Sequence, residues 1–191
     1  MKFFTKTTLV IFLLILSKVQ VFAQLPRNEK GKIEFTEIIK DSITPSILLL
    51  GNGQRWMEKN FKNKEMSITQ DSNATNIKSE GAFLVYNKGI VSKEPHGRIR
   101  FSVQLDVKAN KYRYSFTNFV FEYFKINREY KFTASGKEKP LEDPKASGWQ
   151  KLWNKHKGTT NVQIQNYIAA LKNSMQQNAS VKKPEVKKEE W

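Results

Sequence analysis

Apolar and polar residues alternate through the segment from Arg98 to Phe124, and this alternation constrains the fold more than any other feature of the sequence. A period of two is typical of β-strands, because successive side chains point to opposite faces of a sheet. Ala109 and Asn110 divide the segment into the two strands of a hairpin. Folding there produces three apolar cross-strand pairs: Val107 with Tyr112, Leu105 with Tyr114, and Val103 with Phe116. One face of the hairpin is therefore predicted to belong to the core.

The alternation changes phase within the second strand. Phe119, Phe121 and Tyr123 occupy odd positions, whereas the aromatic residues before them occupy even ones. One extra residue near Thr117 and Asn118 returns both groups to the same face, and a β-bulge inserts such a residue. We therefore predict a bulge at this point and a curved sheet.

Two helices are predicted to cover the apolar face. The first runs from Thr44, as the capping residue, to Phe61, with Pro45 at the first helical position. Gly51 and Gly53 lie inside it, where glycine is unfavourable, and we expect them to allow close packing against the sheet.

The second helix is predicted to begin at Thr160, because Thr160 and Gln163 have capping-box spacing. Its apolar stripe consists of Ile164, Tyr167, Ile168, Leu171 and Met175. A helix with one such stripe needs a covering surface, and the aromatic face of the hairpin supplies it.

Shorter strands complete the sheet. "GKIEFTEII" reads as a strand, and "MSITQ" and "NIKSEGAFLVY" read as a hairpin around the turn-forming "DSNAT". The element order is strand, helix, four strands, helix. This order predicts an α+β fold with one curved antiparallel sheet and both helices on one face.

The first residues have the organisation of a secretory signal peptide. Lys2 and Lys6 precede an apolar run, and Ala23 ends a plausible cleavage site. The run is shorter than the roughly 20 residues that a spanning helix needs, so no transmembrane segment is expected in the mature chain. Residues 24–176 are predicted to form one domain and 177–191 a disordered Lys/Glu-rich tail. We expect the protein to be secreted or periplasmic.

The chain is basic, with a net charge of +15. The segment before the cleavage site holds three lysines and no acidic residue, so the mature chain carries +12. Such a charge suits anionic partners. A lysine-rich surface without a specific partner accounts for it equally, because acidic residues are interspersed with the basic ones.

Three motifs and the long hairpin carry a family resemblance. They are "GKIEFTEII", "RWMEKNF" and "YIAALKNSM", and together with the hairpin they span most of Leu25 to Gln176. In these parts the chain resembles a secreted bacterial domain family of unknown function with a TATA-box-binding-protein-like (TBP-like) fold. The resemblance implies a curved antiparallel sheet with two helices on one side. It implies no activity, because none is assigned to the family.

Residues that carry catalysis are sparse in this sequence. The chain has no cysteine, and its two histidines, His96 and His156, are far apart in sequence. We therefore predict no metal site, no cofactor and no enzymatic activity. His96, in the predicted loop that enters the hairpin, is the one candidate for a general base.

The polar face of the hairpin is the first candidate binding surface. Arg98, Arg100 and Arg113 lie on it among hydroxyl and amide side chains. Such a surface suits anionic or hydroxyl-rich ligands. It is also what the solvated outer face of any single-layer sheet looks like.

The connection 125–159 is the second candidate. It is long for a compact domain and contains nine basic and four acidic residues. Trp149 and Trp153 fall on one side of a helical turn with lysines around them. This pairing suits a membrane interface or a glycan surface, and the tryptophans serve equally as a cover for the open end of the core.

Three functions follow from these features. The first is an exported, non-enzymatic binding module of the cell envelope or extracellular space, whose partner is an unknown protein or an anionic envelope ligand. The second is binding of nucleic acid or another anionic polymer through the basic sheet face, with nucleic acid disfavoured by export. The third is a hydrolase of envelope polymers that uses His96.

Overall fold

The computed structural model describes residues 25–61, 66–71, 74–88 and 93–176, so the predicted signal peptide and tail lie outside the described residues. The strands are β1 (Phe35–Lys40), β2 (Ser67–Asp71), β3 (Ala74–Lys88), β4 (Lys93–Lys108), β5 (Lys111–Ile126) and β6 (Phe132–Pro140). The helices are α2 (Ser46–Asn60) and α3 (Gln150–Gln176). The predicted α+β fold with one antiparallel sheet is confirmed.

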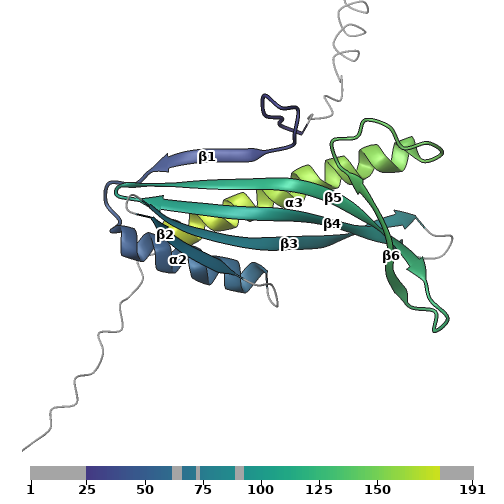
Figure 1. The fold of residues 1–191 in the computed structure, drawn as a ribbon, viewed down its shortest axis with the longest axis horizontal. Helices are drawn as coiled ribbons and strands as arrows, with labels where there is room; N and C mark the ends of the chain where they lie inside the picture. Colours follow the sequence, from purple (N-terminus) through teal and green to yellow (C-terminus); the bar gives the residue numbers. More distant parts are fainter. Residues whose placement is uncertain (1–24, 62–65, 72–73, 89–92, 177–191) are drawn as a thin grey trace, which may run out of the picture.

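The described strands form one sheet in the order β1-β5-β4-β3-β2, with β6 also paired to β5 (Figure 1). β1 pairs with the first half of β5, from Lys111 to Phe116, and β6 pairs with the second half, from Val120 to Ile126. One edge of β5 is therefore completed by strands from opposite ends of the domain.

The predicted hairpin register is confirmed. Val107 pairs with Tyr112, Leu105 with Tyr114, and Val103 with Phe116. The predicted bulge is also present, because Arg100 pairs with Val120 and Ser102 with Thr117, which leaves Asn118 and Phe119 opposite Phe101. Asn118 has a φ of 56°, a left-handed conformation that asparagine tolerates better than most residues.

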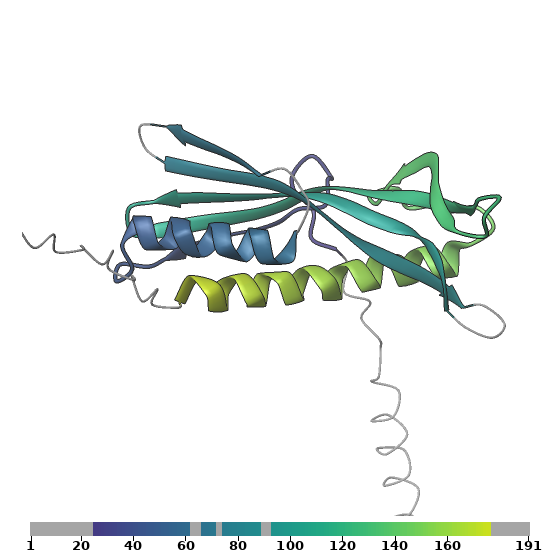
Figure 2. The same ribbon diagram turned by 90° about the horizontal axis from the view of Figure 1, so that it is seen from below.

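Both described helices pack on one face of the sheet and leave the other face uncovered (Figure 2). The core between sheet and helices is aromatic. Its fully buried or nearly buried members include Phe101, Phe116, Phe119 and Phe121 from the sheet, Trp56 and Met57 from α2, and Trp153, Ile164 and Leu171 from α3. Each large side chain buried in this way contributes about 1.5–3 kcal/mol. The predicted apolar stripe of the last helix is part of this core.

The two glycines of α2 behave differently. A Cβ atom on Gly53 would fall inside the van der Waals contact distance of Leu105 Cδ2, so the absence of a side chain lets α2 approach β4 closely. A Cβ atom on Gly51 would meet nothing within 4 Å. The prediction of close packing against the sheet is thus confirmed for Gly53 and wrong for Gly51.

The expected start of α2 needs correction. The helix begins at Ser46, and its capping position, Pro45, has no side-chain hydrogen bond. Asp41 Oδ1 instead accepts hydrogen bonds from the backbone N–H groups of Ile43, at 3.1 Å, and Thr44, at 2.9 Å. The turn before the helix is therefore held by Asp41 rather than by a Thr44 cap.

The connection 125–159 holds two elements that the predicted element order did not include. It contains β6 and the first part of α3, which begins at Gln150 rather than at Thr160. Thr160 Oγ1 donates to the backbone carbonyl of His156 inside the helix, at 2.9 Å, so Thr160 is not a cap. Helix α3 consequently extends along most of the length of the sheet (Figure 2).

Candidate functional site

The uncovered face of the sheet presents side chains in rows that run across the strands. In the middle of the sheet the rows are polar and mostly uncharged: Lys78, Gln104, Ser115 and Thr36 form one row, and Glu80, Ser102 and Thr117 form the next. Thr36 Oγ1 and Ser115 Oγ lie 3.0 Å apart, within hydrogen-bond distance. We call this surface the open face.

A hollow of about 790 Å³ lies at the centre of the open face. Its polar lining consists of Ser67, Lys78, Ser79, Glu80, Ser102, Gln104, Thr117 and Asn118. The bulge shapes one side of it, since it brings Asn118 Nδ2 to 3.2 Å from Ser102 Oγ. Hydroxyl and amide groups both donate and accept hydrogen bonds, so this lining suits a ligand rich in the same groups.

A second, smaller hollow of about 380 Å³ adjoins the first, and Gln104 lines both. At its end of the sheet Lys108 pairs with Lys111, which pairs in turn with Lys40. Within the described residues none of these three lysines forms an ion pair. This end of the open face is therefore positively charged.

Arg98 and Arg100 lie on the open face as predicted, and both are paired with carboxylates. Arg98 donates to Glu122 and Arg100 to Glu138, with Arg100 Nε also 3.7 Å from Glu122. Glu122 and Glu138 are cross-strand partners on β5 and β6. The two arginines are thus neutralised within the protein.

Arg113 is paired as well. Its Nε and one terminal nitrogen donate to Asp106 Oδ2 at 2.8 and 2.6 Å. Asp106 also accepts from Gln104, at 2.9 Å, and from Asn76. This network fixes the orientation of Gln104 at the boundary of the two hollows. The predicted register already placed Asp106 opposite Arg113, so the sequence contained the signal for this pair.

The two candidate tryptophans lie on the opposite side of the sheet from the arginines. Trp153 is 0% exposed, and its Nε1 donates to the backbone carbonyl of Asp143 at 2.8 Å. Trp149 is half-buried and packs against Phe121, with ring centroids 5.6 Å apart. The structure therefore does not bring the tryptophans and arginines together, and Trp153 in particular is a core residue.

The two histidines, expected in separate contexts, are in contact. His96 Nδ1 lies 2.9 Å from His156 Nε2. His96 belongs to β4 rather than to a loop, and the register shift opposite Val85 and Tyr86 leaves it unpaired in the ladder. Its ring packs on Phe121, so it points toward the core and away from the open face. No sequence signal linked these residues, since β4 and α3 are adjacent only in the folded chain.

Burial sets the ionisation of this pair. It lowers the pKa of His156 to about 4, with further lowering from the nearby His96 and Lys155. Burial also lowers the pKa of His96. Both imidazoles are therefore neutral at pH 7, and one donates its N–H proton to the other.

A third ionisable cluster joins β1 to α3. Tyr114 Oη donates to Glu37 Oε2 at 2.6 Å, and Lys172 Nζ donates to the same oxygen at 2.7 Å. The hydrogen bond from Lys172, followed by that from Tyr114, lowers the pKa of Glu37. Burial and the bond to Glu37 raise the pKa of Tyr114. The cluster contributes to structure at the sheet edge.

The described residues lack two further features. They contain no group of three or more His, Cys, Asp or Glu side chains placed to hold a metal ion. None of their helices combines the length and the apolar character needed to cross a bilayer.

Comparisons with known proteins agree with the fold. Residues 30–122 match a family described as a domain of unknown function (DUF4468) with TBP-like fold. A TBP-like protein from Parabacteroides distasonis has a similar structure, with a TM-score of 0.52 and 17% identity over 80% of this chain and 97% of that one. A DUF4468 family protein from Bacteroides ovatus gives a TM-score of 0.53 and 10% identity over 82% and 92%. A comparison with curated proteins returned no match.

Proposed function

Residues 30–122 belong to the DUF4468 family, a domain of unknown function with TBP-like fold, and from the geometry of this chain we propose a non-enzymatic binding module that holds its ligand on the open face. The observation that carries the proposal is the central hollow, which lies on the face that neither described helix covers. A surface with many fixed donors and acceptors recognises a ligand by hydrogen bonds.

The paired arginines favour a ligand of low charge. Arg98, Arg100 and Arg113 each donate to a carboxylate of the protein, so an anion that used them would first have to displace Glu122, Glu138 or Asp106. Apart from Lys78 and Glu80, which carry opposite charges, the polar side chains that line the hollow are hydroxyls and amides. We therefore propose a hydroxyl-rich ligand, such as a neutral glycan of the envelope or extracellular space.

The arrangement of the histidines supports a binding role over hydrolysis. His96 is the one candidate base from the sequence, and its ring contacts His156 and Phe121 on the helix-covered side of the sheet. A general base must reach the proton that it abstracts, and the sheet separates His96 from the central hollow.

A second candidate function is the binding of an anionic polymer at the lysine end of the open face. Lys40, Lys108 and Lys111 come from three segments of the sheet and lie together without ion pairs among the described residues. Binding of this kind weakens steeply as salt rises, whereas hydrogen bonding to a neutral glycan depends little on salt. The salt dependence of affinity distinguishes the two.

Gln104 is the residue to change first, because it lines both hollows. We expect Gln104→Leu to weaken binding to neutral glycans by about tenfold, since it keeps the size of the side chain and removes its hydrogen bonds. Binding is measured on an array of neutral and anionic glycans and then by titration calorimetry at two salt concentrations.

The matched control is Gln165→Leu, the same substitution at an exposed position of α3. It is expected to bind as the parent does. If the two variants bind equally well, the hollow is not the binding site. If only anionic glycans bind, and only at low salt, the binding site is the lysine end of the open face.

A further inference from the structure

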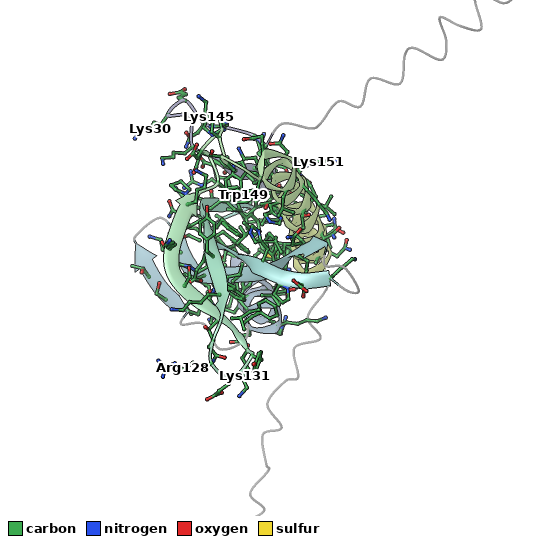
Figure 3. All side chains as sticks on the ribbon, turned by 90° about the vertical axis from the view of Figure 1, so that its right-hand side faces the viewer. Lys30, Arg128, Lys131, Lys145, Trp149 and Lys151 are labelled. Atoms are coloured by element: carbon green, nitrogen blue, oxygen red, sulfur yellow. The ribbon has the colours of Figure 1, made fainter. Side chains whose placement is uncertain are left out.

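The hairpin of β5 and β6 extends beyond the rest of the described domain (Figure 1). Figure 3 shows Arg128 and Lys131 at its far end, away from the body of the protein. The turn is closed by two backbone hydrogen bonds, from Asn127 N–H to the Lys131 carbonyl at 2.9 Å and from Tyr130 N–H to the Asn127 carbonyl at 3.1 Å. We call residues 125–132 the hairpin tip.

Tyr130 occupies a backbone conformation that tyrosine disfavours. Its φ is 58°, in the left-handed region where glycine is the usual residue. The other described non-glycine residues with positive φ are asparagines, Asn110 and Asn118, which tolerate this region. Tyr130 is 90% exposed, so core packing does not offset the strain. A strained residue that contributes nothing to the core points to a role outside the fold.

The hairpin tip also has an apolar side. Ile126 and Phe132 are direct cross-strand partners, so their side chains lie on the same side of the hairpin. Ile126 is 58% exposed and Phe132 is 37% exposed. Together with Tyr130 they give a narrow projection an aliphatic side chain and two aromatic ones in contact with solvent.

Basic residues are the neighbours of these apolar residues along the chain. Lys125, Arg128 and Lys131 lie within the tip, against one acidic residue, Glu129. Glu129 pairs with Lys131 at 3.0 Å, and both side chains are largely exposed. The tip therefore carries an excess of two positive charges.

We propose that the hairpin tip docks on a lipid bilayer with anionic headgroups. Aromatic and aliphatic side chains enter the interfacial region of a bilayer, and adjacent lysine and arginine side chains pair with anionic headgroups. A narrow projection fits this partner, because a bilayer surface adapts around a few inserted side chains. The proposal concerns a surface separate from the central hollow and holds whatever ligand the hollow takes.

The test is co-sedimentation of the chain from Gln24 to Trp191 with vesicles. This form omits only residues that precede the described domain. One set of vesicles contains equal parts of phosphatidylglycerol and phosphatidylcholine, and the other contains phosphatidylcholine alone. The parent is expected to bind the first set and to bind the second at least about tenfold more weakly.

Tyr130→Gly separates docking from stability. It removes the strained side chain, so the melting temperature is expected to equal or exceed that of the parent while vesicle binding falls about tenfold. Ile126→Ser is expected to reduce binding similarly. Ile43→Ser is the matched control, because Ile43 is an exposed isoleucine outside the hairpin, and it is expected to bind as the parent does.

The charge requirement has its own pair of variants. Arg128→Gln is expected to weaken binding to the anionic vesicles by about fivefold. Lys151→Gln removes one charge from an exposed position of α3 and is expected to weaken binding by less than about twofold. Equal binding by the tip variants and their controls would overturn the proposal, because the general basic charge would then account for the affinity. Failure of the parent to bind vesicles would overturn it too and would leave a protein as the partner of the tip.

Discussion

The contact between His96 and His156 makes the stability of the domain depend on pH. His156 is 1% exposed, and its pKa in the folded protein is about 4. A histidine in an unfolded chain has a pKa of about 6.5. As the pH falls below about 6.5, the unfolded chain takes up this proton first, and stability is lost until the pH reaches the folded pKa of about 4.

We expect the titration of His156 to lower the free energy of unfolding by about 2 kcal/mol as the pH falls from 7 to 4.5. Urea denaturation at several pH values measures the loss. Carboxylates also titrate toward the lower end of this range, so the comparison is with His156→Gln, in which the histidine contribution is absent. Parallel pH profiles for the parent and the variant would show that His156 does not titrate in this way.

Three other residues show how a site forms from groups that the sequence presents singly. The arginines at 98, 100 and 113 were found from their alternation, which fixes the face of the sheet on which they lie. The carboxylate partners of Arg98 and Arg100 depend on the bulge and on β6, which bring Glu122 and Glu138 onto the same face. A face can be predicted from periodicity, whereas its net charge requires the register.

Among the elements, α2 depends on one of its two glycines for contact with the sheet. Gly53→Ala would place a methyl group against Leu105, which is fully buried and has little room to move. We expect this variant to lose about 1–3 kcal/mol of stability. Gly51→Ala is its control in the same helix, and it is expected to gain about 0.5–1 kcal/mol, because alanine is the better helix former and the site is open.

Chemical denaturation of the two alanine variants measures both effects. Opposite signs are the expected result. A loss of stability in Gly51→Ala, or none in Gly53→Ala, would mean that α2 packs against the sheet in another way.

The elements that could be predicted from sequence are those with one buried side. The β4–β5 hairpin, its bulge and the apolar stripe of α3 each repeat apolar residues at the period of the structure that they form. β6 could not be found in this way, because most of its residues are exposed and it includes Gly136 and ends at Pro140. It forms because the second half of β5 offers unpaired backbone groups along its edge.

Helix α3 begins at Gln150, ten residues before the predicted start at Thr160, and this difference has another cause. Gly158 and the threonines after it resemble a helix boundary, and a start at Thr160 follows from local rules. In the folded chain Trp153 and His156 are buried on the preceding turns, and a side chain at Gly158 would meet nothing within 4 Å. Tertiary packing therefore extends the helix through a residue of poor helix propensity.

At the scale of the whole molecule, the first prediction concerns where the protein resides. The pattern up to Ala23 predicts export and cleavage, and the described domain begins two residues later, at Leu25. N-terminal sequencing of the protein recovered from the envelope fraction is expected to begin at Gln24. Recovery from the cytoplasm with an intact Met1 would rule out this processing.

The sheet as a whole divides the molecule into two sides with different chemistry. The helix-covered side holds the aromatic core, both histidines, Trp149 and Trp153. The open face holds the hollows, the paired arginines and the lysine end. Variants of the open face are therefore expected to change ligand binding with little effect on stability. Variants of the helix-covered side are expected to change stability with little direct effect on ligand binding.

The way in which β1 enters the sheet has a consequence for the order of folding. In the described sheet, β2 to β6 each pair with the strand that precedes or follows them, whereas β1 pairs with β5 across the chain, Phe35 opposite Phe116. Closing a long loop loses more entropy than closing a hairpin, so the hairpins form before β1 docks. Until then the first half of β5 has an open edge that a neighbouring chain can pair with. The docking rate of β1 thus sets how long each newly folding molecule is exposed to aggregation.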